Sequence, residues 1–430
     1  MPSASATLRE TRPVTHALAN CVGHPRSVLV VGRDLDAATA VAVDRGARVV
    51  TLAEPGASTS GGAGERATFD SLVGSKAEFD LIILGDAAAS VPDAVQHISR
   101  FVPLLGDGGH TLITLPAPNS PHSSMPSAPA TFTRDNAIKL VEDSGLEVMR
   151  VEDAATSPLY VRFVQSVHSL VTKTPRQLAG EHGVIIARRP PRPGRLDVTI
   201  GMLTLNEQES VEQMLDDIHA VAPDAKILII DSSSDRTPEL AIAKGARVVR
   251  QLPARGHGPA MERLMYEAAK QSEALIYLDC DFTYPTGTIR RIRELLDSGV
   301  DVVNTTRTHR YPKEMPIPNF VANRFFAATA QVIHGVPTTD VHSGMRGYRC
   351  SVIRAFDFDG EGDALPLDTL ILPAKSHYHV AELPIPYLKR VGESKLAKLR
   401  GTMWTFVRIV SAIGEGSRVR RGIRYRHVDD

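Results

Sequence analysis

The sequence predicts two α/β domains, each a three-layer unit in which a sheet lies between two layers of helices. Short apolar runs alternate with amphipathic stretches from residue 27 to residue 187, and the same alternation resumes at residue 197. Between the two series, RPPRPGR at 189–195 holds three prolines and a glycine. Proline does not continue a helix or a central strand, so this segment is predicted to be a linker. Regular alternation of strands and helices is typical of a parallel sheet covered on both faces.

The first series contains five apolar runs with the length of strands buried on both faces. These runs are 27–32, 47–54, 79–86, 110–116 and 183–189. Helices are predicted between them at 34–45, 91–105 and 133–144. Thr133 or Asp135 is positioned to cap the last helix. The stretches 55–67 and 116–131 are rich in Gly, Ser, Pro and Ala and are predicted to be mobile loops.

The second series repeats this pattern after the linker. Its predicted strands are 197–203, 225–231, 246–251, 274–281 and 300–306. Its predicted helices are 207–221, 236–244, 258–271 and 285–298. The predicted organisation is a flexible N-terminus (1–26), a first domain (27–188), the linker (189–196), a second domain (197–415) and a basic flexible tail (416–430).

Composition and charge exclude several classes of protein. The chain has 430 residues, 43% of them hydrophobic, which is ordinary for a protein with a buried core. Lys and Arg total 49, as do Asp and Glu, so a global basic field for nucleic acid is not expected. The sequence has no uninterrupted apolar run of about 18 residues, so a transmembrane helix is not expected. The polar N-terminus lacks the apolar core of a signal peptide, so secretion is not expected either. Cys21, Cys280 and Cys350 have no metal-binding spacing and are expected to be reduced thiols in the cytoplasm.

The sharpest local signal is LDCD at 278–281, where an apolar run ends. Asp279 and Asp281 stand two residues apart, and where the chain leaves the sheet their carboxylates can converge on one cation. Hard oxygen ligands suit Mg²⁺ or Mn²⁺, and such an ion can also hold a diphosphate. Asp279 and Asp281 are therefore the predicted metal ligands.

Three further polar turns follow predicted strands of the second domain. They are LNE at 205–207, DSSSDRT at 231–237 and RGHGPA at 255–260. In open α/β sheets, ligands bind at the carboxyl ends of the strands, where such turns gather. The glycines of the third turn allow close approach of the backbone, and the start of a helix favours phosphate. Arg255, in this turn, is a candidate for binding the phosphates of a nucleotide.

Residues 197–410 resemble an inverting family 2 glycosyltransferase of the GT-A fold, and within it the dolichol-phosphate mannosyltransferase branch, which makes polyprenyl-phosphate sugars. The resemblance is carried by LTLNEQES (203–210), IIDSSSDRTPELA (229–241), YLDCDFTYP (277–285), TTDVHSGMRGYR (338–349) and AELPIPYLKRVGESKL (381–396). These segments occur in the family order, and the last two separate this branch from other nucleotide-sugar folds. Thr283 departs from the pattern, because many relatives carry Gln there.

The resemblance implies a role for each matching residue. The positions that line the base and ribose correspond to Asn206, Glu207 and Asp231. The metal and diphosphate motif corresponds to Asp279 and Asp281, and a basic residue near the donor phosphates to Arg307. The segment near the acceptor entrance contains Ser343 and Arg346, and an acidic helix position near the acceptor corresponds to Asp368. The loop that closes over phosphate contains Arg390, Ser394 and Lys395.

The nature of the acceptor decides which groups are catalytic. A phosphate monoester is already anionic at pH 7, so cationic side chains that position it matter more than a base. Arg346, Arg390 and Lys395 are the candidates for this role. A hydroxyl acceptor would need a carboxylate base, and Asp368 is the first candidate for it.

Residues 27–160 resemble a class I S-adenosylmethionine-dependent methyltransferase. The resemblance rests on VLVVG (28–32), on 79–116 and on 132–152. The family turn G-x-G-x-G is replaced by GRDLD at 32–36, whose added bulk and charge crowd the cofactor. A non-catalytic domain for docking or dimerisation is therefore predicted, with active methylation as the alternative. Asp34 and Glu54 are the candidates if S-adenosylmethionine binds.

The main hypothesis is a cytoplasmic, metal-dependent glycosyltransferase, peripheral at the inner face of the membrane, that moves a sugar from a GDP- or UDP-sugar to polyprenyl phosphate. A soluble or natural-product acceptor, a bifunctional methyltransferase–glycosyltransferase and a non-catalytic nucleotide-sugar-binding scaffold remain alternatives. Residues 397–413, which contain the single Trp404, predict either a helix on the membrane surface or a helix packed on the domain or on a second copy. From Lys389 to Asp430 there are 11 basic and 4 acidic residues, a local excess that suits phosphate.

Overall fold

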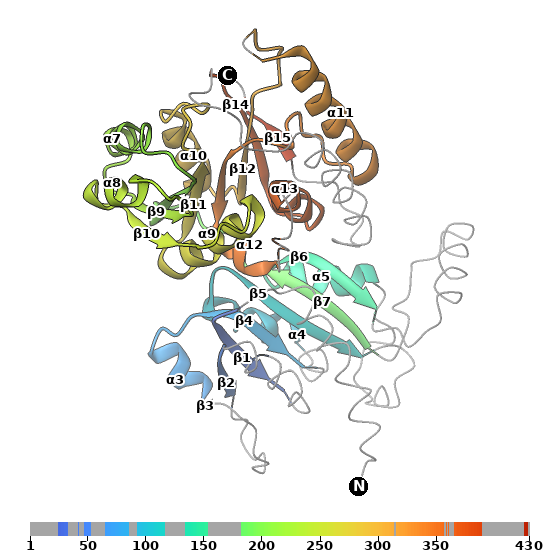
Figure 1. Cartoon of the computed structure of the whole chain (residues 1–430). Helices are drawn as coiled ribbons and strands as arrows, with labels where there is room; N and C mark the ends of the chain where they lie inside the picture. Colours follow the sequence, from blue (N-terminus) through green and yellow to red (C-terminus); the bar gives the residue numbers. More distant parts are fainter. Residues whose placement is uncertain are drawn as a thin grey trace. The chain divides into compact units, whose positions relative to one another are not determined.

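The computed structural model describes residues 25–32, 42, 47–52, 65–85, 93–116, 134–153, 182–313, 315–356, 358, 360, 365–388 and 425–428 (Figure 1). The chain divides into two compact units. Unit 1 comprises Met1–Pro190 with Arg354–Asp357 and Ser417–Arg420, and unit 2 comprises the remaining residues. Each unit contains its own sheet, so the predicted pair of α/β units is confirmed.

The described part of unit 1 has seven strands in the order β3-β2-β1-β4-β5-β7-β6. Its strands are β1 (Ser27–Val31), β2 (Arg48–Leu52), β3 (Glu65–Ala67), β4 (Phe79–Leu84), β5 (Leu105–Pro116), β6 (Glu147–Asp153) and β7 (His182–Arg188). Its helices are α3 (Phe69–Gly74), α4 (Ala94–Ser99), η2 (Val102–Leu104) and α5 (Arg134–Asp143). The buried side chains Leu29, Val31, Ile82 and Leu84 pack under these helices.

Three expectations for unit 1 need correction. The sheet is mixed, because β7 pairs antiparallel with both β5 and β6. The alternation of strands and helices predicted a parallel sheet. Apolar composition shows how deeply a strand is buried but not its direction, so the antiparallel course of β7 could not be read from it. The predicted loop 55–67 ends in β3, and the predicted helix 91–105 is divided into α4 and η2 before β5 begins at Leu105.

Unit 2 contains an eight-stranded sheet among the described residues, in the order β10-β9-β8-β11-β13-β12-β14-β15. Its strands are β8 (Val198–Thr204), β9 (Lys226–Asp231), β10 (Arg247–Arg250), β11 (Ala274–Leu278), β12 (Val302–Thr306), β13 (Met345–Arg349), β14 (Val380–Pro384) and β15 (Tyr425–His427). Its helices are α7 (Val211–Val221), α8 (Thr237–Ala243), α9 (His257–Gln271), α10 (Thr288–Asp297), α11 (Ile317–His334), α12 (Cys350–Ala355) and α13 (Leu365–Lys375).

Strand β13 is the feature of this sheet that matters most for the site. It lies between β11 and β12 and runs antiparallel to both, whereas the other described pairs are parallel. The first residue of β13, Met345, pairs with the last residue of β11, Leu278. The residues just before β13 therefore reach the same end of the sheet as the residues just after β11.

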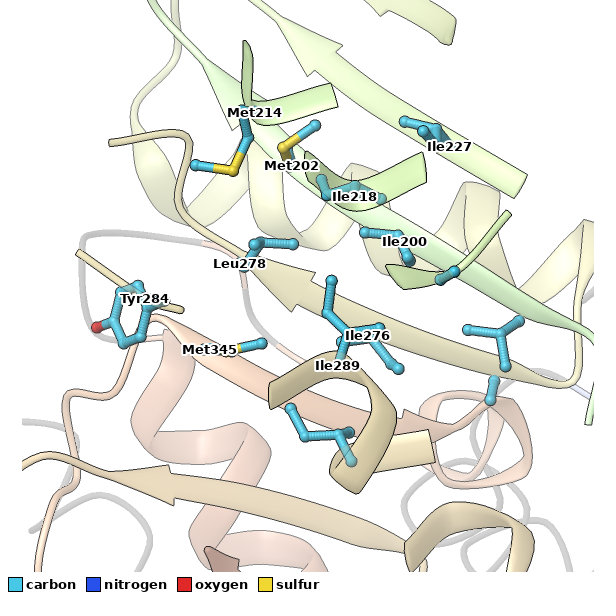
Figure 2. Packing of buried hydrophobic residues seen from close by; sticks show 14 of the residues in the cluster. Ile200, Met202, Met214, Ile218, Ile227, Ile276, Leu278, Tyr284, Ile289 and Met345 are labelled. Carbon is cyan, nitrogen blue, oxygen red and sulfur yellow. The ribbon is translucent and has the colours of Figure 1, made fainter. Parts of the chain in front are cut away.

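Helices cover both faces of the sheet of unit 2. Because side chains alternate along a strand, Ile200 and Met202 face one side, and Figure 2 shows them packed with Met214 and Ile218 of α7. Helices α8 and α10 pack in the same cluster. On the other face α9 contacts β8, and its Leu264 lies so close to Gly201 that a Cβ there would approach to 2.8 Å. Helix α13 packs beside α9 on this second face.

Several predictions lie outside the described residues. These are most of the predicted helix 34–45, the segment 397–413 and the site candidates Asp34, Glu54, Arg390, Ser394 and Lys395. Within the described ranges, no helix combines the length and the apolar character needed to cross a membrane.

Candidate active site

The turn after β8 is joined to the turn after β9 by Asn206. This residue adopts a left-handed backbone conformation with a φ of 56°. Its amide donates a hydrogen bond to Ser233 Oγ at 2.8 Å, and its Oδ1 accepts one from the amide of Ser234 at 2.9 Å. Asparagine tolerates this conformation better than other side chains do, because its amide can bond locally. Asn206 thus holds the two turns together at the carboxyl end of the sheet.

Asp231, the last residue of β9, is completely buried. Its carboxylate accepts hydrogen bonds from Thr204 Oγ1 at 2.7 Å and Ser233 Oγ at 2.6 Å. It also forms an ion pair with Arg250 at 2.7 Å. These contacts fix the shape of the DSSSDRT turn. The predicted contact of Asp231 with a base or ribose remains a prediction.

Glu207 connects the first turn to the residues that follow β11. Its amide donates to Thr237 Oγ1 at 2.8 Å, and its carboxylate lies 3.4 Å from Ser210 Oγ. The same hydroxyl donates to the carbonyl of Cys280 at 3.1 Å. Burial, together with the charge of Glu207, raises the pKa of the Cys280 thiol to about 12. Cys280 is therefore a neutral side chain between the two aspartates at neutral pH.

Asp279 is held by a chain of polar side chains on the α9 face of the sheet. His257 Nε2, at the start of α9, lies 3.1 Å from the hydroxyl of Tyr277. Tyr277 in turn donates a short hydrogen bond to Asp279 Oδ1. Burial and the charge of Asp279 raise the pKa of the buried Tyr277 well above its usual value, so the phenol stays protonated and donates. The apolar run containing Tyr277 gave no sign of this role, because the strand as a whole reads as core.

The other side of Asp279 lies against the backbone of Gly344. A Cβ at position 344 would come within 2.2 Å of Asp279 Oδ2, so any larger residue there would displace the carboxylate. The amide of Asp279 donates to the carbonyl of Gly344 at 3.2 Å, and the amide of Gly344 donates to Tyr284 at 2.5 Å. The segment before β13 therefore shapes the site directly.

Asp281 is buried, and its Oδ1 accepts a hydrogen bond from the amide of Thr283 at 3.0 Å. The hydroxyl of Thr283 is also buried, and it has no hydrogen-bond partner in the described part of the chain. Among the described residues, no group of three or more His, Cys, Asp or Glu side chains is arranged to hold a metal by itself. The oxygen donors of Asp279, Asp281 and Thr283 are of the kind that suits a Mg²⁺ or Mn²⁺ ion whose coordination is completed by substrate phosphates.

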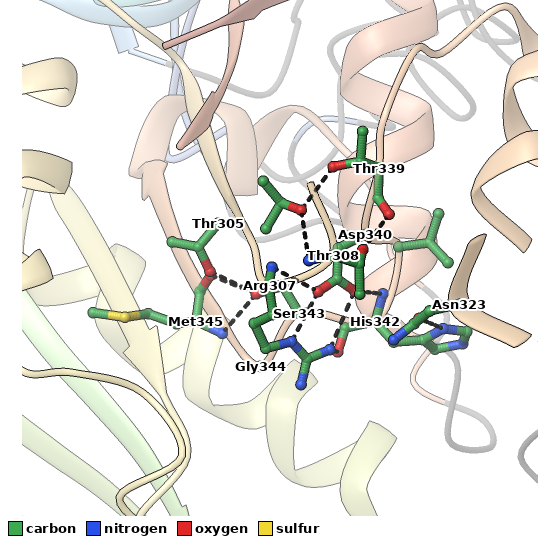
Figure 3. A network of polar contacts seen from close by, with 12 residues as sticks. Thr305, Arg307, Thr308, Asn323, Thr339, Asp340, His342, Ser343, Gly344 and Met345 are labelled. Carbon is green, nitrogen blue, oxygen red and sulfur yellow. Dashed lines mark hydrogen bonds and ion pairs between the residues drawn. The ribbon is translucent and has the colours of Figure 1, made fainter. Parts of the chain in front are cut away.

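Arg307, just after β12, forms an ion pair with Asp340 in the interior of unit 2 (Figure 3). Its Nε lies 2.8 Å from Asp340 Oδ2 and its Nη2 3.1 Å from Oδ1, which is a bidentate arrangement. Burial alone would lower the pKa of Arg307, but the charge of Asp340 raises it overall. Burial opposes ionisation of Asp340 as well, yet Arg307 lowers its pKa. Both groups are therefore charged, and the charge of Asp279 contributes to the raised pKa of Arg307.

The segment that carries Asp340 is fixed from two sides. Glu382, buried on β14, accepts hydrogen bonds from Thr338 Oγ1 at 2.7 Å and from Thr339 Oγ1 at 2.6 Å. His342 Nδ1 lies 3.0 Å from Asn323 Oδ1 of α11, as Figure 3 shows. Burial lowers the pKa of His342 to about 4, so this ring is neutral at pH 7.

Ser343 and Arg346 are both buried. The hydroxyl of Ser343 lies 2.6 Å from that of Thr305. Arg346 donates to the carbonyl of Val341 at 2.8 Å and, by a short contact, to the carbonyl of Pro366 in the first turn of α13. Arg346 therefore anchors the turn that contains the buried Asp368. The predicted contacts of all three residues with an acceptor remain predictions.

Arg255 differs from these residues because its side chain is exposed. It precedes Gly256, whose φ of 104° is a conformation that glycine adopts readily, and α9 begins at His257. The turns bearing Asn206, Glu207, Asp231, Asp279 and Asp281 all follow strands at one end of the sheet. The sequence did not reveal the roles of Tyr277, Tyr284, Asp340 and Gly344, whose partners are Asp279, Gly344 and Arg307. Asp340 and Gly344 lie in a segment quoted for the resemblance, but their partners could not be read from it.

Polar side chains gathered at the carboxyl end of a mixed sheet define unit 2 as a ligand-binding α/β unit. Residues 199–356 match the model of the family described as Glycosyl transferase family 2. A dolichyl-phosphate hexose transferase of Haloferax volcanii is 35% identical over 206 residues, which cover 48% of this chain and 89% of that protein. The chain belongs to glycosyltransferase family 2.

Two further similarities each cover about half of the chain. An undecaprenyl-phosphate mannosyltransferase of Micrococcus luteus is 24% identical over 51% of this chain and 97% of its own length. Among solved structures, glucosyl-3-phosphoglycerate synthase of Mycobacterium tuberculosis in complex with Mn²⁺, UDP and phosphoglyceric acid is 20% identical, with a TM-score of 0.42. That likeness covers 52% of this chain and 80% of the synthase chain.

Proposed function

We propose that unit 2 transfers a sugar from a nucleotide diphosphate sugar to polyprenyl phosphate, with inversion at the anomeric carbon. One observation carries this proposal. Asp279 and Asp281 follow β11 directly, and Arg307, paired with Asp340, also donates to the carbonyl of His342 in the segment whose Gly344 packs against Asp279. Paired acids and the guanidinium of Arg307, which is 11% exposed, suit a diphosphate with its cation. The two named relatives act on dolichyl phosphate and undecaprenyl phosphate according to their names, which supports a polyprenyl acceptor.

The proposed cation is Mg²⁺ or Mn²⁺, held by Asp279 and Asp281 together with the donor diphosphate. When bound, such an ion stabilises the negative charge that develops on the leaving diphosphate. The protein has to hold the two carboxylates ionised and correctly turned. Tyr277 and Gly344 do this for Asp279, one by donating a hydrogen bond and the other by leaving space.

The proposed reaction needs no strong base. An anionic oxygen of the acceptor phosphate forms a bond to the anomeric carbon while the bond from that carbon to the diphosphate breaks, and the electron pair leaves with the nucleoside diphosphate. The attacking and leaving groups carry like charges, so cationic side chains must bring them together. Arg346, Arg390 and Lys395 are proposed to do so on the acceptor side, with Ser394 in the same loop as the last two. Asp368 becomes the candidate base only if the acceptor is a hydroxyl.

Unit 1 is proposed to be a Rossmann-like unit of methyltransferase type without catalytic activity. Its strands β3, β2, β1, β4 and β5 follow the order 3-2-1-4-5 of doubly wound folds. Its first strand is followed by Gly32 and then by charged residues where the family turn has two further glycines. We propose a docking role for this unit. Heat released on titration with S-adenosylmethionine would instead favour a bifunctional enzyme.

A screen of donors and acceptors tests the proposed function. UDP- and GDP-sugars are offered with Mn²⁺ to a short-chain polyprenyl phosphate and to water-soluble hydroxyl and phosphate acceptors, and products are identified by mass spectrometry. A polyprenyl-phosphate sugar of inverted configuration is the expected product. Transfer only to soluble acceptors would replace the proposed acceptor, and absence of transfer or hydrolysis with every donor would favour a scaffold.

Tyr277→Phe is expected to weaken productive metal binding by about tenfold or more, because residues that orient metal ligands contribute on this scale. The phenol is the group that donates to Asp279, and the substitution removes only its hydroxyl. The Mn²⁺ concentration that half-activates transfer should rise, and Mn²⁺ binding to the UDP- or GDP-loaded protein, followed by electron paramagnetic resonance, should weaken in parallel. Tyr266→Phe on α9 is the matched control, since that ring is half exposed. Equal Mn²⁺ affinity in both variants would exclude a positioning role for Tyr277.

A further inference from the structure

Helix α11 carries an exposed apolar stripe that the proposed chemistry does not use. Ile317, Val321, Phe325 and Val332 recur at spacings of four, four and seven residues, so they lie along one side of the helix. Their exposed fractions are 63, 57, 60 and 85%. The opposite side of the helix is buried against unit 2 and includes Phe326, Ala327, Ala330 and His334. We call the four exposed residues the α11 stripe.

Positive charge borders the α11 stripe. Between residues 302 and 339 the sequence has four Lys or Arg residues and one acid, Glu314. Arg307 is paired inside the unit, whereas Arg310, Lys313 and Arg324 are exposed. Arg324 stands beside Phe325 on the helix itself. The exposed surface of this helix is thus apolar along its length and basic at its border.

The basic loop before α11 is fixed against the start of the helix. The ring of Tyr311 packs edge-on against Phe320 at 5.1 Å, and its hydroxyl donates to the carbonyl of Met315 at 3.2 Å. Arg310 and Lys313 flank Tyr311 in the sequence. Their charges are therefore held near the N-terminal end of the α11 stripe.

We infer that the α11 stripe and its basic border dock on an anionic lipid bilayer. Apolar side chains on one side of a helix with Lys and Arg beside them are typical of helices that lie in the plane of the headgroups. The basic border complements anionic headgroups, each charge adding to the attraction. A second copy of this chain is a poorer occupant. In an antiparallel two-fold pairing of α11 with itself, Arg324 near the middle of the helix would face its own copy, and like charges repel.

The buried side of α11 links this surface to the site. Asn323 contacts His342 at 3.0 Å, and the ring of Phe326 lies 5.5 Å from that of His342. His342 belongs to the segment that carries Asp340 and Gly344. This inference rests on the proposed function, because only a lipid-linked acceptor needs the site close to a bilayer. A helix is about 10 Å thick, so docking by α11 brings that segment within about one helix diameter of the headgroups.

Vesicle sedimentation with the full-length chain tests the inference. The double variant Val321→Ser/Phe325→Ser is compared with Ile242→Ser, which removes an equally exposed apolar side chain from α8 (59% exposed). With vesicles of phosphatidylglycerol and phosphatidylcholine in equal amounts, the partition coefficient of the double variant should fall by about tenfold. Arg310→Gln/Lys313→Gln should lower it by about fivefold per charge, and only when phosphatidylglycerol is present.

The outcomes separate this inference from the proposed function. Loss of vesicle binding with unchanged transfer to a short-chain, water-soluble polyprenyl phosphate supports both. Vesicle binding by the stripe variant equal to that of the unaltered chain overturns the docking surface. A change from dimer to monomer in light scattering, without a change in vesicle binding, overturns it in favour of a second copy. Absence of transfer by every form, with vesicle binding still dependent on the stripe, overturns the proposed acceptor and leaves the surface standing.

Discussion

Asp279→Asn and Asp281→Asn are each expected to lower kcat/KM for sugar transfer by at least about a thousandfold. The stabilisation of a leaving diphosphate by a divalent ion is worth several kcal/mol, and each substitution removes one of the two proposed carboxylate ligands. Asparagine has nearly the same volume as aspartate, so the packing against Gly344 and the hydrogen bond from Thr283 should survive. Initial rates over a range of Mn²⁺ concentrations, with the donor identified by the screen, measure the effect.

The control for these variants is Asp216→Asn. Asp216 is an exposed acid that pairs with Lys244 on the surface of unit 2, far in sequence from the proposed ligands. Its loss should leave transfer unchanged. Circular dichroism and thermal unfolding of all three variants check that the fold persists. If both Asp279→Asn and Asp281→Asn transfer sugar at the rate of the control, these residues do not hold the metal.

Asp340→Asn is expected to destabilise the protein by about 3–5 kcal/mol, which is the usual cost of leaving a buried charge without its partner. The substitution leaves the guanidinium of Arg307 charged and without its partner, because Asp340 is completely buried, Arg307 is only 11% exposed and the pair is bidentate. The midpoint of the unfolding transition of unit 2 should fall by about 10 °C. Asp216→Asn serves again as the control and should leave the unfolding midpoint nearly unchanged, because exposed ion pairs contribute little to stability.

The double variant Arg307→Gln/Asp340→Asn distinguishes the lost pair from a general packing defect. If the uncompensated charge is the cause, removing it restores part of the lost stability. An additive double variant would indicate that the two side chains do not depend on one another.

The dependence of the free energy of unfolding on pH has a definite sign. The folded state lowers the pKa of Asp340, so the unfolded chain binds the proton more tightly. The contribution of the pair is present above the pKa of an ordinary aspartate and is lost as the pH falls through the lower pKa of the folded state.

The parts of the fold that follow local rules were predicted from the sequence. Strands such as β8, β9 and β11 are apolar runs that end in polar turns, and their boundaries agree with the expectations to within a few residues. Because parallel strands share their carboxyl end, the turns after them could be placed together without knowing any side-chain contact. The family 2 assignment is confirmed as well, and three of the five segments that carried it stand in these turns.

The features of the fold and the site that were not predicted depend on strand direction and on pairing between distant segments. The segment at 338–349 was recognised as a motif, yet a single sequence does not show that Met345 begins an antiparallel strand beside Leu278. Tyr277 looked like a core residue because the apolar neighbours around it dominate the pattern. Its hydroxyl matters only because His257 and Asp279 stand on either side of it in space. Periodicity reports which face of an element is buried, whereas such contacts depend on the tertiary arrangement.

The central position of β13 has a consequence for synthesis of the chain. Strands β11 and β12 emerge from the ribosome before β13, which separates them in the finished sheet. Until residue 349 has been made, the backbone groups that β11 will offer to β13 have no native partner, and such open edges favour pairing with other chains. The segment that packs against Asp279 arrives with β13. The gap between β11 and β12 therefore closes and the backbone of Gly344 reaches the proposed catalytic carboxylate of Asp279 in one step, which couples the protection of the growing chain to the completion of its site.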